Sequence, residues 1–335
     1  MKVLLSILVG LCLAAQAEER FRLTQPVEYS GMCDASGGVP VSSNRFVAVS
    51  DEDNILRLYA TDRPGPALKE YDMNAFLQPG GKSSEADLEG AARIGDRAFW
   101  IGSHGRNRDG KERRSRHVLF ATDIAVTNNE VALTPVGKPY SRLVEELAAD
   151  TRFDSFRLAA ASLLAPKEPG ALNIEGLAAT AEGHLLIGFR NPIPGAKALL
   201  IPLLNPNEVI LGKSGVFGAP VQLELGGLGI RDIAFYLNTY VIIAGPSGGD
   251  GPFHLYRWSG PGAVPVPLEV TIPKGFQAEG LLLYPQTGLR EFQILSDDGN
   301  RLVDGRPGKE IPDPQRRTFR SVWVVPAADS GGGAQ

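Results

Sequence analysis

DLEGAARIGDRAFWIGSH, residues 87–104, aligns without a gap with NIEGLAATAEGHLLIGFR, residues 173–190. Each stretch opens near an acidic residue followed by glycine, passes through a turn, and enters an apolar run that ends at a small or polar residue. Two short β-rich runs on either side of a Gly-Asp or Glu-Gly turn are typical of a β-hairpin. The chain therefore contains an internal hairpin repeat, from which the remaining architecture can be predicted.

Three more copies of this hairpin occur in the chain. They are less regular than the first two, but each has an acidic residue, a turn and a β-rich run. Their sequences are IRDIAFYLNTYVIIAGP at 230–246, AEGLLLY at 278–284 with REFQILSDDG at 290–299, and DASGG at 34–38 with RFVAVSDE at 45–52.

A second β-rich pair follows each hairpin, for example VLFAT at 118–122 with EVALT at 130–134. Four strands per repeat are typical of a β-propeller blade. The leading acids lie about 45 to 60 residues apart, except for one longer interval, and propeller repeats have similar periods. We therefore predict an all-β β-propeller with five visible repeats, a spacing that also accommodates six blades. The leading acids are Asp34, Glu89, Glu175, Asp232 and Glu279.

The N-terminus has the pattern of an export signal. Lys2 precedes an apolar run of about 13 residues, and a small-x-small cleavage pattern ends at residue 17. The run is shorter than the roughly 20 residues needed to span a bilayer, so it predicts a signal peptide over residues 1–17 and not a transmembrane anchor. We expect a periplasmic or secreted protein. Cleavage would leave Cys33 as the single cysteine, without an internal disulfide.

The rest of the chain predicts one propeller domain over residues 18–327 and a disordered Gly-rich tail over 328–335. Loss of Lys2 with the signal peptide changes the formal net charge from -4 to -5. This mild acidity provides no general attraction for nucleic acid, which we do not expect as a partner.

The longer interval between repeats has apolar residues at helical spacing, which predicts a helical insertion at about 140–165. Such an insertion could cover a blade edge or form a lid or partner surface. Residues 20–25 and 319–325 both read as strands, and pairing them in one blade would close the ring and remove exposed sheet edges.

The repeated acids point to a charged site on the propeller axis, because the first strand of each blade lines the central channel. Like charges at short range raise one another's pKa, so a cation must lie among them. That cation could be arginine or histidine from the protein, or a bound hard cation such as Ca²⁺, which prefers oxygen ligands. Further oxygens could come from Asp51, Glu52, Asp297 and Asp298. The candidate metal ligands are Asp34, Glu89, Glu175, Asp232 and Glu279.

GSHGRN at 102–107 is the richest segment in reactive groups. His104 is the candidate catalytic residue, because imidazole transfers protons near neutral pH. Guanidinium groups and a nearby amide suit an anionic ligand. The candidate ligand-binding residues are Arg106, Asn107, Arg190 and Arg231.

Five strings carry a resemblance to a known family: LEGAA at 88–92, WIGSHGRN at 100–107, LNIEGLA at 172–178, GFRNP at 188–192 and GLGIRDI at 227–233. Over about residues 34–298 the chain resembles a bacterial domain-of-unknown-function family, number 3616. More distantly, the Glu-Gly-Leu-Ala pattern is similar to the esterase-like phytase families, whose members are secreted propellers. That resemblance implies phosphomonoester or ester hydrolysis, although the chain lacks the run of aspartates that builds adjacent calcium sites in calcium-dependent phytases.

Two functions follow as expectations. The first is an exported propeller that binds a small anionic ligand at an acidic and basic channel mouth, with metal-assisted phosphoester or ester hydrolysis as its activity. The second is a non-catalytic interaction or scaffold protein in which the charged ring is structural. Propeller folds host many activities, so the fold does not decide between them.

Overall fold

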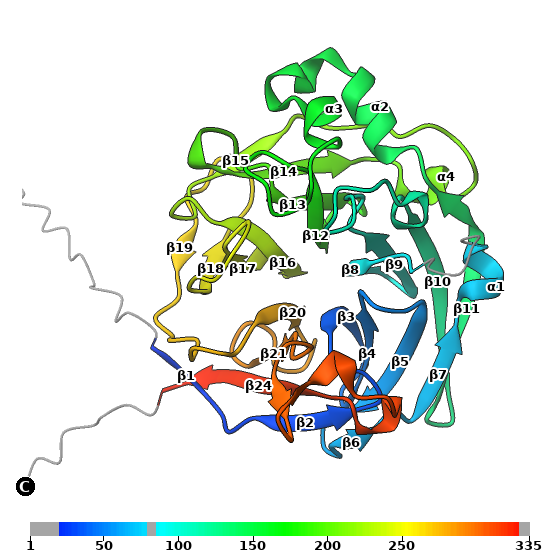
Figure 1. Ribbon diagram of the computed structural model, residues 1–335, viewed down its shortest axis with the longest axis vertical. Coiled ribbons are helices and arrows are strands. Elements are labelled where there is room, and N and C mark those ends of the chain that lie inside the picture. The colour runs from blue at the N-terminus through cyan, green and yellow to red at the C-terminus, as the bar shows by residue number, and fades with distance from the viewer. Residues whose placement is uncertain (1–19, 79–84, 328–335) are drawn as a thin grey trace, which may run out of the picture.

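The computed structural model describes residues 20–78 and 85–327, which form five β-sheets around a central axis (Figure 1). The predicted β-propeller is confirmed, and it has five blades. The predicted signal peptide at 1–17 and tail at 328–335 lie outside the described residues.

Each of the first four blades is a four-stranded antiparallel sheet whose first strand lies nearest the axis. Blade 1 consists of β3 (Ala35–Ser42), β4 (Arg45–Ser50), β5 (Ile55–Ala60) and β7 (Lys69–Asp72). Blade 2 consists of β8 (Leu88–Ile94), β9 (Arg97–Gly102), β10 (Leu119–Thr127) and β11 (Glu130–Tyr140). Blade 3 consists of β12 (Asn173–Ala179), β13 (Leu185–Asn191), β14 (Ala198–Leu203) and β15 (Val221–Leu223). Blade 4 consists of β16 (Gly229–Tyr236), β17 (Thr239–Gly245), β18 (His254–Trp258) and β19 (Val266–Pro267).

The fifth blade joins the two ends of the described chain. The C-terminal strand β24 pairs with β21 on one side and with the N-terminal strands β1 and β2 on the other. The expected pairing of the terminal strands is confirmed, and it closes the ring. The strands of this blade are β20 (Ala278–Leu282), β21 (Phe292–Ser296), β24 (Thr318–Pro326), β1 (Phe21–Leu23), β2 (Val27–Ser30) and β6 (Gly65–Pro66).

Apolar packing between neighbouring blades holds the ring together. Each pair of adjacent blades encloses its own cluster of buried apolar side chains. Between blades 5 and 1, for example, the rings of Tyr29, Tyr59 and Phe319 lie with centroids 5.3 Å apart. Aromatic pairs at this separation contribute about 0.5–1.5 kcal/mol beyond the burial of their surface. The sheets therefore need no disulfide, and Cys33 is free and buried.

Short helices connect the strands. Between blades 2 and 3, α2 (Leu143–Ala149), η2 (Thr151–Phe156) and α3 (Leu158–Ala161) bury Leu143, Leu147 and Leu158 in the cluster that these blades share. Within the described ranges, no helix is long and apolar enough to cross a membrane. The other elements are α1 (Asn74–Leu77), α4 (Pro206–Val209), η1 (Arg114–Arg116), η3 (Pro194–Ala196), η4 (Gly308–Glu310), η5 (Pro314–Arg316) and the hairpin of β22 (Leu302–Val303) and β23 (Arg306–Pro307).

Candidate functional site

A one-residue bulge interrupts the innermost strand of every blade at the same place. In each case the strand skips one residue in its pairing with the second strand of the blade. A bulge leaves its extra residue outside the ladder and redirects its side chain, so the five skipped residues are structurally equivalent. We call them the bulge ring: Ser36, Glu89, Glu175, Arg231 and Glu279.

The bulge ring differs from the expected ring of five acids at two positions. Asp34 lies two residues before the bulge of blade 1, in the same place as Asp87, Asn173 and Gln277 of other blades. Asp232 lies one residue after the bulge of blade 4, and Arg231 takes the ring position. A shift of one residue along a strand turns a side chain to the opposite face, which separates Asp232 from the other acids.

Four of the five bulge residues line a polar cavity of about 800 Å³ on the axis, at the end where the innermost strands begin. Eleven carboxylates and eight basic side chains line it. Asp34, Glu89, Glu175 and Glu279 are among them, so the structure brings four of the five predicted metal ligands to one cavity. Asp232 does not line it: its Oδ1 accepts a hydrogen bond from the Ile233 N–H at 2.8 Å, and its Oδ2 accepts one from the Leu281 N–H at 2.7 Å.

Four side chains on blades 3, 4 and 5 neutralise one another, and we call them the paired sector: Glu175, Arg190, Arg231 and Glu279. Arg190 Nη1 donates to Glu175 Oε1 at 2.6 Å, and Arg231 Nε lies 2.8 Å from Glu175 Oε2. Arg231 also forms an ion pair with Glu279. Burial lowers the pKa of Arg231 to about 10, although Glu175 opposes the shift. The arginine remains charged at neutral pH and forms ion pairs with two glutamates.

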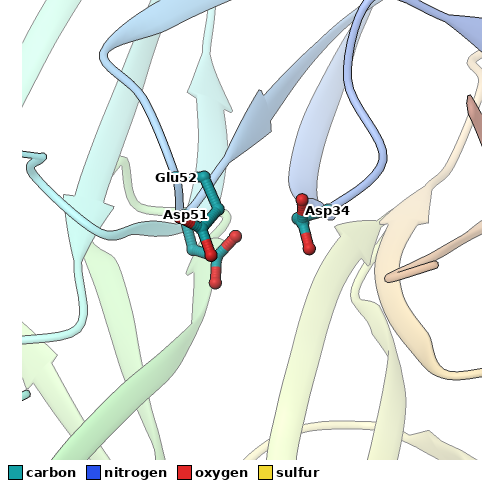
Figure 2. Close-up of side chains that lie close together, drawn as sticks. All are labelled: Asp34, Asp51 and Glu52. Carbon is teal, nitrogen blue, oxygen red and sulfur yellow. The ribbon is translucent and has the colours of Figure 1, made fainter. Parts of the chain in front are cut away.

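The opposite side of the cavity has carboxylates without such partners. We call Asp34, Asp51 and Glu52 the open sector; one carboxylate oxygen from each lies within 4.8 Å of the others. Figure 2 shows Asp34 on one side of a space and Asp51 with Glu52 on the other. In the described part of the chain, none of the three forms an ion pair with a basic side chain. Asp51 Oδ1 is buried, and no hydrogen-bond partner for it occurs among the described residues.

Asp34 and Asp51 of the open sector resist ionisation. Burial, followed by the charge of Asp297, raises the pKa of Asp34 to about 7, although the Cys33 thiol donates to Asp34 Oδ2 at 2.9 Å. Burial and then the charges of Asp297 and Asp34 raise the pKa of Asp51 well above its ordinary value. A positive charge among these groups would relieve both the burial penalty and the repulsion.

Two further acids lie in blade 2. Asp87 forms an ion pair with Arg116 at 2.8 Å, and burial raises its pKa to about 6 although Arg116 opposes the shift. Glu89 has no comparable partner. Burial, followed by the charges of Glu175 and Asp87, raises the pKa of Glu89 well above its ordinary value.

The structure places the predicted catalytic histidine away from the cavity. His104 is 1% exposed, its ring stacks on His117 with centroids 5.7 Å apart, and its Nδ1 lies 2.9 Å from the Gly102 carbonyl oxygen. Burial, with a further contribution from His117, lowers the pKa of His104 to about 3. The imidazole is neutral and enclosed, and it is not among the residues that line the cavity.

Of the four predicted ligand-binding residues, three line the cavity and one does not. Arg106 donates hydrogen bonds to the carbonyl oxygens of Ser162 and Gly110, and the first of these connects its loop to the helical segment. Arg106 does not line the cavity. Asn107 lines the cavity, but its Oδ1 accepts hydrogen bonds from two backbone N–H groups of its own loop. Arg190 and Arg231 line the cavity within the paired sector.

Several cavity residues were absent from the set of candidates derived from the repeat. Asp87 and Asn173 occupy the same position of the repeat, two residues before the glutamate. The alignment of the two repeats could therefore have identified both as candidate cavity residues. Arg113 and Lys167 reach the cavity from irregular loops, and Lys309 reaches it from the short helix η4. No periodic pattern marks these three residues, so only the folded chain shows where they lie.

These features define a class of protein: a five-bladed β-propeller with a charged cavity on its axis. Residues 114–274 match the sequence model of a protein family of unknown function, DUF3616. This match supports the family resemblance over that region. No curated protein sequence matches the chain.

Solved structures with a similar fold include several enzymes. A GH43_1 enzyme from Xanthomonas citri shares 11% identity with a TM-score of 0.47, over 90% of both chains. The α-L-arabinofuranosidase PaAbf62A from Podospora anserina shares 10% identity with a TM-score of 0.46, over 93% of this chain and 98% of that one. The PQQ-bound aldose sugar dehydrogenase from Streptomyces coelicolor shares 12% identity with a TM-score of 0.45, over 92% and 99%. At these values the similarity carries no information about activity.

Proposed function

We propose that the axial cavity binds a small anionic ligand together with a Ca²⁺ ion held by the open sector. The observation that carries the proposal is the approach of Asp34, Asp51 and Glu52 within 4.8 Å, with Asp51 Oδ1 buried and unpartnered. Ca²⁺ takes six to eight oxygen ligands, and these carboxylates supply a first set of them. The cation would offset the burial and the repulsion that raise the pKa of Asp34 and Asp51.

Basic side chains at the same cavity suit the anionic ligand. Arg113, Lys167 and Lys309 line the cavity, and within the described residues none of them is ion-paired to a carboxylate. The guanidinium groups of Arg190 and Arg231 are already engaged by glutamates. We therefore assign contact with the anion to Arg113, Lys167 and Lys309, together with the cation, in place of Arg106, Arg190 and Arg231.

Hydrolysis of a phosphoester or carboxylic ester is the activity that such a site would support. A bound cation polarises an ester oxygen and lowers the pKa of bound water. Asp34, Asp51 and Glu52 would hold the cation, while the three basic side chains would orient the anionic group.

Thermal unfolding in Ca²⁺ and in chelator tests the cation site. A ligand at 100 times its Kd stabilises the native state by about 2.7 kcal/mol, so Ca²⁺ should raise the Tm of the wild type. Asp51→Asn should abolish that rise, because it removes a charged ligand from the open sector. Asp123→Asn is the matched control, since Asp123 is an acid of β10 that pairs with Arg97 and does not line the cavity; it should retain the rise.

The competing function is a non-catalytic scaffold in which the charged ring is structural. The paired sector favours it, because Arg231 joins glutamates of blades 3 and 5. A wild type whose Tm does not respond to millimolar Ca²⁺, and which hydrolyses no member of a panel of phosphoesters and carboxylic esters, would establish the scaffold and refute the proposal.

A further inference from the structure

The bulge ring distributes its charges unequally. Around the axis, β16 has β12 and β20 as neighbours, while β8 has β3 and β12. Arg231 of β16 therefore lies between Glu175 and Glu279 and pairs with both. The ring neighbours of Glu89 are Ser36 and Glu175, and neither brings a positive charge.

The ring neighbours of Glu89 therefore do not neutralise it. It is 8% exposed and lines the axial cavity. Within residues 20–78 and 85–327, its carboxyl group forms no hydrogen bond and no ion pair. Most carboxyl groups of such low exposure in proteins are hydrogen-bonded, and Glu89 faces the cavity. The cavity is the direction from which a partner can reach Glu89.

The surrounding charges restrict what that partner can be. Asp87 and Glu175 act electrostatically on Glu89 and would repel an anionic group placed against it. The charges of Arg190 and Arg231 also act in this region, since the charge of Glu89 favours the charged form of both, and they would repel an ammonium group. A neutral hydroxyl group avoids both penalties and can donate a hydrogen bond to the carboxyl group.

We infer that Glu89 hydrogen-bonds a hydroxyl group of the ligand, so that the cavity selects a hydroxyl-bearing anion, such as a sugar or polyol carrying a phosphate or carboxylate. This inference rests on the proposed function, which supplies the site for the anionic group. Glu89 acts as a specificity-determining residue and not as a ligand of the cation. Its position at a bulge, in a rigid strand, suits recognition of one group at a defined place.

Matched pairs of probes test this assignment by calorimetry in the presence of Ca²⁺. The pairs are glycerol 3-phosphate with propyl phosphate, glucose 6-phosphate with hexyl phosphate, and gluconate with hexanoate. The wild type should bind the hydroxylated member of at least one pair about tenfold more tightly or better, the size expected for one hydrogen bond to a buried group. Equal affinity within every pair would overturn the inference.

Two variants test whether the preference for the hydroxylated probe depends on Glu89. Glu89→Met has similar volume and cannot hydrogen-bond, so it should reduce the preference to about twofold or less while the protein stays folded. Glu89→Gln keeps a hydrogen-bonding group and should retain most of the preference. Ser36→Ala, at a bulge position that does not line the cavity, is the control and should leave the preference unchanged.

The Ca²⁺ response separates this inference from the proposed function. Both Glu89 variants should keep the Tm rise in Ca²⁺ that Asp51→Asn loses. A wild-type preference that survives Glu89→Met would refute the role of Glu89 alone. Loss of the Ca²⁺ response in Glu89→Met would make Glu89 a cation ligand, which contradicts the inference but leaves the cation site standing.

Discussion

The paired sector and the open sector line the same cavity, yet their carboxylates are in opposite electrostatic situations. In the paired sector, Arg190 and Arg231 contact Glu175 within 2.8 Å. In the open sector, Asp297 is the main charged neighbour of both Asp34 and Asp51, and Glu52 adds to the repulsion. The first group of carboxylates is compensated by arginines of the protein, whereas the second group is the one that the proposed cation would stabilise. Equivalent strands of a repeated fold can thus place similar carboxylates around one axis in different electrostatic environments.

Loss of the arginine at the centre of the paired sector should have the largest effect. Arg231→Ala would leave Glu175 and Glu279 with less compensation in a buried site, and removal of one partner from a buried pair costs about 3–5 kcal/mol. Urea unfolding monitored by tryptophan fluorescence measures the loss. Lys213→Ala, which breaks the exposed pair with Glu208, is the control and should leave the stability almost unchanged. Equal losses in the two variants would mean that the paired sector is not a structural unit.

The bulge geometry that shapes both sectors should be sensitive to one added methyl group. A Cβ on Gly90, next to the bulge at Glu89, would lie 2.6 Å from the Glu175 carbonyl oxygen. Gly90→Ala should therefore force β8 and β12 apart and cost about 1–3 kcal/mol, as overpacking does. Urea unfolding again measures the change. A loss below about 0.5 kcal/mol would show that the two strands approach less closely than this contact indicates.

The open sector should make stability fall as pH rises when chelator is present. The pKa of Asp34 is raised from 3.8 to about 7, so the folded protein retains a proton that the unfolded chain releases between these values. The contribution of Asp34 is complete below about pH 4 and is lost as pH rises through 7. The difference in unfolding free energy between the wild type and Asp34→Asn should fall by at most about 1.4 kcal/mol per pH unit. A difference that is flat from pH 4 to 7 would contradict the raised pKa.

Local patterns in the sequence were sufficient to predict much of the fold. A hairpin depends on residues close together in the chain, so the repeat predicted the blades, and the two terminal strands predicted the ring closure. The same repeat marked Glu89, Glu175 and Glu279 as inward-facing, because each precedes a glycine at the same place in its hairpin. Asp34 reaches the same cavity from a position two residues before the bulge.

Only the tertiary structure decided how those charges are shared. In blade 4 the bulge falls at Arg231 and not at Asp232, and this one-residue difference converts an expected acid into the cation that neutralises two neighbours. Asp51 and Glu52 meet Asp34 across the ends of two paired strands, although 17 and 18 residues separate them along the chain. The physical reason is that strand register sets the face on which a side chain lies, and packing between blades sets which charges come within range.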